Sequence, residues 1–480
     1  MDRFNFGDDD LYDGRDPDDG REEMMRRFRE RLNSEEGEGG DVPGTDMLEE
    51  MVEACLDEER YDEGLRITDF WLRFAPYSHV AWLRRGALLI GLGRAEEALS
   101  CFDRADALNP SDIENLINRG IAYDSLGLSE RALECYCRAL DREPDNEEAL
   151  FNQAIALARM ERFAEAVGMF EALLDSQQFG RDSLYELGYC FDFLDRLDDS
   201  LSAYERYLDQ DPYNYNAWYN RAIVFSRKGH YAKAVESYDM AIAINDEFPS
   251  AWYNRGNALA NLGRLVDAAA SYREALKYET NDIPTWYNLG NAYEEMGDLV
   301  AAIDAFSQVI RLEPGNHEAY FGRGSCHDGL EDFDLALNDY ERALALNPDG
   351  ADLWFAHADA LYNVGRIQES LASYGKAVEI DPDDVECWFE YGETLYEGGM
   401  LNDALGAFET AIQLEPEWSE SHYGRARVLL ALKRLDEMAG SLRTAIGLDP
   451  RLRAEFIDEF PEAASLKEVK GILSESTNDL

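Results

Sequence analysis

Large, small and polar side chains recur along this chain at a fixed spacing. Trp218, Trp252 and Trp286 are separated by 34 residues, and the same register extends in both directions without an insertion or deletion. Self-similarity at such a period is typical of stacked repeats, in which each unit packs on its neighbours. The register divides residues 45–452 into twelve units that start at residues 45, 79, 113, 147, 181, 215, 249, 283, 317, 351, 385 and 419.

The pattern within one unit, with its positions numbered from 1 to 34, predicts two helices. Position 4 is bulky, position 24 is aromatic, and positions 8 and 20 are small in almost every unit, as in Gly256 and Ala268. Antiparallel helices approach closely only where side chains are small, so we expect glycine at position 8 to face alanine at position 20. Glycine near position 15 and proline at position 32 mark the turns. Each unit is therefore predicted to be a hairpin of two helices of about 12–14 residues.

One segment carries a recognisable motif. The stretch Ala251–Gly263, with the sequence AWYNRGNALANLG, and the following Ala268, Tyr272 and Ala275 resemble the tetratricopeptide repeat. The resemblance covers residues 45–452. It implies an all-α fold, a right-handed superhelical α-solenoid of twelve 34-residue helix-turn-helix units whose first helices line a concave groove. The first and last units depart from the pattern, as terminal caps that face solvent do.

The two ends of the chain have a different composition. Residues 1–44 are rich in acidic residues and glycine, and we expect a mostly disordered leader with one short amphipathic helix over Arg21–Leu32. This leader is either a solubility tail or a recruitment element. Residues 453–480 are expected to form a C-terminal capping helix and tail, with Phe456–Leu473 largely helical over the final hairpin.

The net charge excludes several classes of partner. The chain has 99 acidic and 45 basic residues, a formal charge of −54, which repels phosphate backbones and anionic membrane surfaces. No stretch approaches a membrane-spanning length, no secretory signal begins the sequence, and the seven cysteines form no C-x-x-C pair. We therefore expect a cytoplasmic protein that binds neither nucleic acid nor membrane. Its oligomeric state cannot be deduced from the sequence.

The sequence contains no enzyme motif. A phosphate-binding G-x-x-x-x-G-K-[ST] loop, a G-x-S-x-G elbow and an H-E-x-x-H pair are all absent, and the six histidines never stand at a metal-ligand spacing. His327 and His357 occupy helix-packing positions. The sequence therefore predicts a non-catalytic protein with no cofactor and no metal.

The resemblance places positions 5, 6, 9, 12 and 13 of the first helices in the groove. Position 5 is aromatic in nine consecutive units, and position 6 is asparagine in five. Asparagine can donate to a peptide carbonyl and accept from a peptide N–H, while aromatic rings offer apolar platforms. In the alternative interpretation both residue types support helix packing. The candidate peptide-binding residues are Asn118, Asn152, Tyr185, Tyr219, Asn220, Tyr253, Asn254, Asn257, Tyr287, Asn288, Asn291, Phe321, Phe355 and Phe389.

The charge of the groove positions points to the partner. Acidic residues such as Asp328, Asp359 and Glu393 dominate positions 9, 12 and 13, and position 5 never carries the lysine of the family's carboxylate clamp. The sequence predicts an interaction scaffold or adaptor that binds basic or neutral extended segments of other proteins. The alternative is a regulatory or structural subunit that recruits substrates to a separate enzyme or assembly through its convex face.

Overall fold

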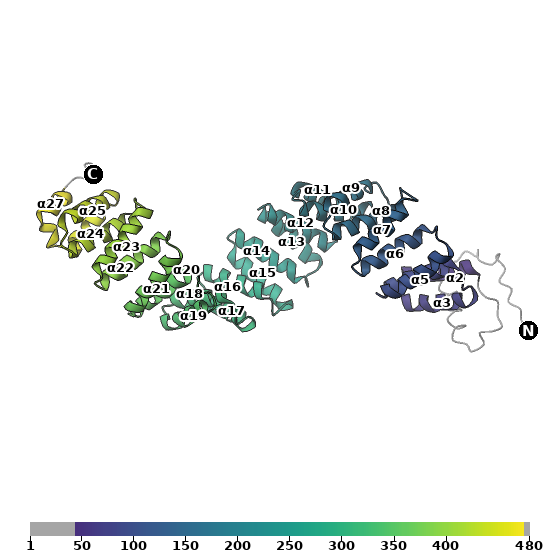
Figure 1. Cartoon of the computed structure of the whole chain (residues 1–480), viewed down its shortest axis with the longest axis horizontal. Helices are drawn as coiled ribbons and strands as arrows, with labels where there is room; N and C mark the ends of the chain where they lie inside the picture. The colour runs from purple at the N-terminus through teal and green to yellow at the C-terminus, as the bar shows by residue number, and fades with distance from the viewer. Residues whose placement is uncertain (1–43, 475–480) are drawn as a thin grey trace, which may run out of the picture. The chain divides into compact units, whose positions relative to one another are not determined.

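The computed structural model describes residues 44–474, and all the regular structure in this range is helical. The described residues form two compact units, one ending at Gly229 and the other beginning at His230. Figure 1 shows each unit as a row of antiparallel helices joined by short turns. The predicted amphipathic helix over Arg21–Leu32 and the rest of the leader up to residue 43 lie outside the described residues.

The N-terminal unit contains five hairpins and the first helix of a sixth. Each helix packs on the next, and the first helices of successive hairpins also contact one another, as α4 does with α6 and α6 with α8. The helices are α2 (Thr45–Asp57), α3 (Tyr61–Phe74), α4 (His79–Gly91), α5 (Ala95–Leu108), α6 (Ile113–Ser125), α7 (Ser129–Leu140), α8 (Glu147–Arg159), α9 (Phe163–Ala172), α10 (Gly180–Phe193), α11 (Leu197–Leu208) and α12 (Tyr215–Arg227).

The C-terminal unit continues the same alternation. Its helices are α13 (Tyr231–Ile244), α14 (Pro249–Asn261), α15 (Leu265–Tyr278), α16 (Ile283–Glu295), α17 (Leu299–Leu312), α18 (His317–Gly329), α19 (Phe333–Leu346), α20 (Ala351–Asn363), α21 (Ile367–Ile380), α22 (Val385–Glu397), α23 (Leu401–Leu414), α24 (Ser419–Ala431), α25 (Leu435–Leu448), α26 (Leu452–Glu459) and α27 (Lys467–Ser474). All but one of the first helices begin at the residue that starts a predicted repeat, and α10 begins one residue earlier. The helix-turn-helix solenoid is confirmed, and the helix starts fit twelve repeats.

An aromatic side chain at position 24 forms the centre of ten hairpins, and Thr68 and Leu442 take this place in the first and last. These rings are among the largest fully buried side chains, as Phe102 and Tyr272 illustrate. A Cβ atom added to Gly256 would lie 2.5 Å from Cε1 of Tyr272, and one added to Gly86 would lie 2.2 Å from Cε1 of Phe102. The ring at position 24 is therefore the nearest neighbour of an atom added to the glycine at position 8, and the contact of this glycine with alanine at position 20 stays a prediction.

Three local features fix the connections between helices. Position 15 has a left-handed backbone, with φ between +69° and +78° at glycines such as Gly263 and +62° at Glu331. Asparagine or aspartate precedes many first helices and caps them. For example, the side chain of Asn316 accepts a hydrogen bond from the backbone amide of Ala319. The indole of the tryptophan at position 4 donates to a carbonyl in the preceding turn, for example Trp354 Nε1 to Pro348 O at 2.8 Å.

The C-terminal segment differs from the expected single capping helix. After α26 the chain turns at Pro461, forms a short 3₁₀ helix over Ala463–Ser465, and then enters α27. Proline cannot continue a helix, which explains the interruption. Phe456, Val469 and Ile472 are nevertheless fully buried against the last hairpin, so both helices cover its apolar surface.

Candidate functional site: the first-helix faces of the repeats

The predicted peptide-binding residues all lie on first helices. Each is half-buried except Asn291, which is exposed. They are distributed over α6 (Asn118), α8 (Asn152), α10 (Tyr185), α12 (Tyr219 and Asn220), α14 (Tyr253, Asn254 and Asn257), α16 (Tyr287, Asn288 and Asn291), α18 (Phe321), α20 (Phe355) and α22 (Phe389).

The rings at position 5 have a packing role. The centroid of the Phe151 ring lies 5.7 Å from that of Phe170, the buried ring at position 24 of the same repeat. The pair Phe355–Tyr374 has a separation of 5.9 Å with the rings edge to face, which is a favourable aromatic geometry. One side of each position-5 ring is therefore used to hold the hairpin together.

Two asparagines at position 6 connect neighbouring repeats, whereas Asn152 and Asn254 donate to carbonyls of their own helices. In the N-terminal unit, Asn220 Nδ2 donates to Tyr185 Oη of the preceding repeat at 2.9 Å. In the C-terminal unit, Asn288 Nδ2 donates to Tyr253 Oη at 3.2 Å and to Asn257 Oδ1 at 2.9 Å. These bonds support the packing interpretation of the amides, and their contact with a ligand stays a prediction.

Carboxylates on α18, α20 and α22 form a row along the first-helix face of the C-terminal unit. This acidic row consists of Asp328, Asp359, Glu390 and Glu393. Burial raises the pKa of Asp328. Burial also raises the pKa of Asp359, and the negative charges of Asp328 and Glu386 add to the rise although a hydrogen bond from Tyr374 opposes it.

Electrostatic repulsion adds to the effect of burial on α22. Burial first, and then the carboxylates of Asp359, Glu393 and Glu386, raise the pKa of Glu390 to about 7. Glu393 accepts a hydrogen bond from Arg427 Nη1 at 2.8 Å, yet burial still raises its pKa. The row therefore has an excess of negative charge, which a cationic group would relieve.

Comparison with family models decides the classification of the chain. The tetratricopeptide repeat model matches residues 117–167, 151–215, 193–247, 219–282, 287–351 and 327–385, which together are more than half of the chain. Two further tetratricopeptide repeat models match residues 79–112 and 373–406. The chain belongs to the tetratricopeptide repeat family. Proteins built on these repeats bind other proteins or peptides, so this repeat protein is a protein-interaction scaffold in general terms.

Solved structures of other repeat proteins align with this one at low TM-scores. MamA 41-end from Desulfovibrio magneticus RS-1 is 22% identical, with 35% of this chain and 96% of that chain covered and a TM-score of 0.34. YrrB, described as a TPR protein with an unusual peptide-binding site, is 26% identical, with coverages of 40% and 98% and a TM-score of 0.36. The APC/C hetero-tetramer Cut9–Hcn1 gives 15% identity, coverages of 95% and 95%, and a TM-score of 0.38. No curated protein matches the sequence.

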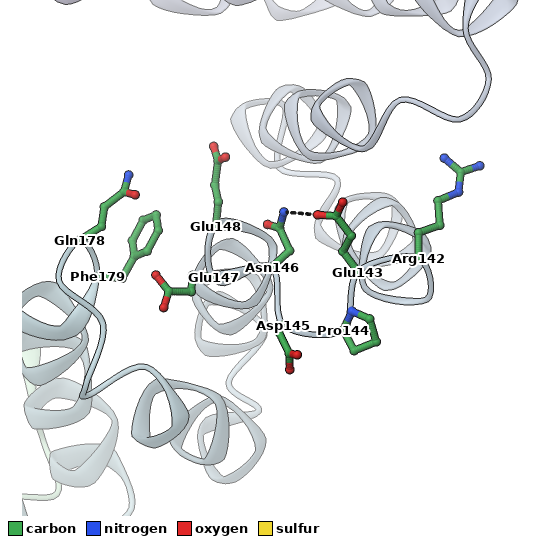
Figure 2. A pocket seen from close by; sticks show the side chains of 9 residues that line it. All are labelled: Arg142, Glu143, Pro144, Asp145, Asn146, Glu147, Glu148, Gln178 and Phe179. Carbon is green, nitrogen blue, oxygen red and sulfur yellow. Dashed lines mark hydrogen bonds between the residues drawn. The ribbon is translucent and has the colours of Figure 1, made fainter.

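A hollow of about 650 Å³ in the tetratricopeptide array lies apart from the predicted residues. It lies between the α7–α8 turn and the residues that precede α10, and Figure 2 shows the side chains that line it, with Asn146 donating to Glu143. The lining residues are Arg142, Glu143, Pro144, Asp145, Asn146, Glu147, Glu148, Gln178 and Phe179, so none of the candidate peptide-binding residues takes part.

Thiol and metal chemistry find no support in the described part of this repeat protein. Six of the seven cysteines are buried, and Cys137 is exposed. Burial raises the pKa of Cys190, Cys326 and Cys387 to about 12, which makes these thiols poor nucleophiles. Among residues 44–474, histidine, cysteine, aspartate and glutamate form no group suited to a metal ion. No helix in this range is long and apolar enough to cross a bilayer.

Sequence reasoning missed two features of the first-helix faces. Glu390 stands at position 6, where five other repeats have asparagine, and this change placed on α22 a carboxylate whose pKa burial and neighbouring charges raise to about 7. On α9 and α10, Phe163, Tyr189 and Phe193 form a partly exposed cluster, with centroids of Phe163 and Phe193 separated by 4.8 Å. The unusual aromatic residues at positions 9 and 13 of this one repeat were the available signal.

Proposed function

We propose that this protein is a non-catalytic scaffold that binds basic or neutral extended segments of other proteins along its first-helix faces, in the cytoplasm, over twelve repeats that span residues 45–452. The observation that carries the proposal is the acidic row. Its carboxylates are partly buried, and nearby positive charges do not balance their negative charge. Binding of lysine or arginine side chains would therefore relieve the repulsion between these carboxylates.

The surroundings of the row suit an extended peptide. Position 6 is glycine in α18 and alanine in α20, so neither Gly322 nor Ala356 carries a long side chain beside the row, although the ring of Phe306 fills the space next to Gly322. Phe321 and Phe355 lie beside them at position 5 and are half-buried, which leaves part of each ring available for apolar contact. An extended segment with alternating basic and apolar side chains therefore matches both the negative charge of the acidic row and the apolar rings of Phe321 and Phe355.

The experiment uses the intact chain to select from a library of random peptides. We expect the selected peptides to be enriched in lysine and arginine, and the variant Asp359→Asn/Glu390→Gln to lose most of this enrichment. The matched control Asp304→Asn/Asp334→Asn removes two exposed carboxylates from the second helices α17 and α19 and should retain it. Selection of acidic peptides, or equal loss in both variants, would contradict the proposal.

The alternative of a structural subunit that uses the opposite face is favoured by a separate observation. Val266, Val300 and Leu335 on the second helices α15, α17 and α19 are 72%, 64% and 53% exposed. Exposed apolar side chains in successive repeats can mark a protein contact. Val266→Ser/Val300→Ser should leave peptide selection unchanged, whereas loss of a captured protein partner in this variant alone would favour the alternative.

A further inference from the structure

The N-terminal unit has a first-helix face of a different chemistry from the acidic row. Position 9 is isoleucine in α6 and α8 and tyrosine in α10, and these side chains together with Phe163 and Phe193 define an apolar strip. Ile121, Ile155 and Phe163 are half-buried, while Tyr189 is 39% and Phe193 57% exposed. The strip crosses neighbouring helices, because α6 contacts α8 and α8 contacts α10.

Partly buried carboxylates lie on the same first helices as this apolar strip. Burial and the charge of Glu114 raise the pKa of Glu148 on α8. Burial raises the pKa of Glu186 on α10 to about 7, with a contribution from Asp182 and an opposing one from Arg159. The surface therefore combines exposed aromatic rings with partly buried acids, a setting that suits a segment with both apolar and cationic side chains.

The chain itself contains such a segment. Residues 24–32 read MMRRFRERL, with four arginines and one glutamate in a protein whose formal charge is −54. In a helical conformation Met25, Phe28 and Leu32 would share one face at spacings of three and four residues, with arginines beside them. An amphipathic helix laid on an apolar groove is a common mode of recognition.

The linker allows this contact within one molecule. The twelve residues 33–44 span at most about 40 Å when fully extended. Packed helices lie about 8–10 Å apart, so α6, α8 and α10 are roughly 16–20, 24–30 and 32–40 Å from α2 across the row of first helices. Residues 24–32 can therefore reach the strip from their own chain.

We propose that residues 24–32 dock on the apolar strip formed by Ile121, Ile155, Phe163, Tyr189 and Phe193 of the same chain. The docked segment occupies the groove of the N-terminal unit and leaves the acidic row of the C-terminal unit to other ligands. The leader is thus a built-in ligand, and a partner of the N-terminal unit must displace it. This inference is independent of the proposed function, because it concerns another surface and another occupant.

Photo-crosslinking of the full chain tests the contact directly. With benzoylphenylalanine in place of Phe28 and irradiation at low protein concentration, we expect crosslinks within single chains to residues of α6, α8, α9 and α10, located by mass spectrometry of peptides. Tyr189→Ala/Phe193→Ala should lower the yield of these crosslinks about tenfold, because it removes the two aromatic side chains that anchor the segment. Both side chains are more than one-third exposed, so the repeats should stay folded, and the helical circular dichroism of the variant checks this.

A matched control separates docking from nonspecific aromatic contact. Tyr77→Ala/Tyr213→Ala removes two tyrosines of the same unit that are 83% and 80% exposed and lie outside the strip, so the crosslink yield should not change. Arg26→Glu/Arg27→Glu should lower the yield as the aromatic change on the strip does. Crosslinks only between chains, crosslinks onto the C-terminal unit, or a yield insensitive to Tyr189→Ala/Phe193→Ala would overturn the inference. Selection of basic peptides through Asp359 and Glu390 can succeed or fail regardless of this result.

Discussion

Single residues set the geometry of every repeat. The tryptophan at position 4 combines apolar packing with one hydrogen bond to the turn before its helix, and this bond recurs at Trp82, Trp218, Trp252, Trp286, Trp354 and Trp388. In the last repeat His422 takes the same place, with Nε2 at 2.9 Å from Pro416 O. A ring nitrogen at this position therefore anchors the inter-repeat turn, which explains why the tryptophan spacing revealed the repeat.

Trp354→Phe tests this anchor. The change keeps an aromatic ring but removes the bond to Pro348 O, and we expect a loss of about 1 kcal/mol in the free energy of unfolding. Urea denaturation of the full chain, followed by circular dichroism, measures the shift. An unchanged midpoint would show that the indole acts only by packing.

The left-handed turn residue offers a change in the opposite direction. Glu331 has a φ of +62°, where seven other repeats have glycine. Side chains other than glycine lose about 1 kcal/mol or more in this conformation, so Glu331→Gly should stabilise the protein by about 1 kcal/mol. Gly263→Ala should destabilise it by a similar amount, and thermal melting of both variants checks the pair. If both variants shifted the melting temperature in the same direction, this explanation would be contradicted.

At the scale of helices, arginine at position 7 connects two consecutive second helices. Arg255 of α14 donates to Asp239 on α13 and to Ser271 on α15. Arg323 of α18 likewise contacts Ser307 on α17 at 3.0 Å and pairs with Asp339 on α19 at 2.7 and 2.8 Å. Each such arginine therefore fixes a first helix against the second helix of its own hairpin and that of the preceding hairpin.

Burial decides how much these ion pairs contribute. The side chain of Asp339 is 5% exposed and that of Asp239 is 51% exposed. Removing the buried partner leaves an arginine with unsatisfied donors, so Asp339→Ala should destabilise the protein by about 2 kcal/mol. The same change at Asp239 should give less than about 1 kcal/mol. Equal losses in chemical denaturation would show that burial does not control the contribution.

The hairpins could be predicted from the sequence because steric size alone determines them. The positions of small, aromatic and turn-forming residues located the first helices to within one residue. Which residues contact each other was harder to predict from the sequence. At Gly256, side-chain direction decides that the ring of Tyr272 is the nearest neighbour. The bonds between Tyr253, Asn257 and Asn288 join different repeats, and a pattern within one repeat does not specify them.

The irregular parts of the site could not be predicted for the same reason. The cluster of Phe163, Tyr189 and Phe193 combines two repeats at a place where α9 is short and the next helix starts early. The break in the capping segment at Pro461 depends on how α26 and α27 both fit the last hairpin. Such features arise from departures from the repeat, and a repeating pattern carries no information about them.

At the scale of the whole molecule, negative charge dominates the solution behaviour. Folding raises the pKa of Glu390 to about 7, above the value of roughly 4.3 for an unfolded glutamate. Between these values the folded state binds more protons than the unfolded state, so the stability contributed by this group falls as pH rises from about 4.5 to 7. Burial and the carboxylates of Asp359, Glu393 and Glu386 are the causes.

Glu390→Gln should remove this pH dependence. At pH 4 the variant and the parent should be about equally stable, because glutamate is then largely neutral in both the folded and the unfolded protein. At pH 8 the variant should be more stable by about 1 kcal/mol, a figure reduced from the full pKa difference because the side chain is partly exposed. Denaturation midpoints at both pH values measure the effect. A difference that shrinks as pH rises would contradict it.

The central claim is that the first-helix face of the C-terminal unit binds basic segments. Hydrogen–deuterium exchange of the full chain, with and without a selected lysine- and arginine-containing peptide, tests it most directly. The account predicts slower exchange in α18, α20 and α22, and little change in α17, α19 and α21. Protection confined to the second helices, or none in the acidic row at saturating peptide, would contradict the claim.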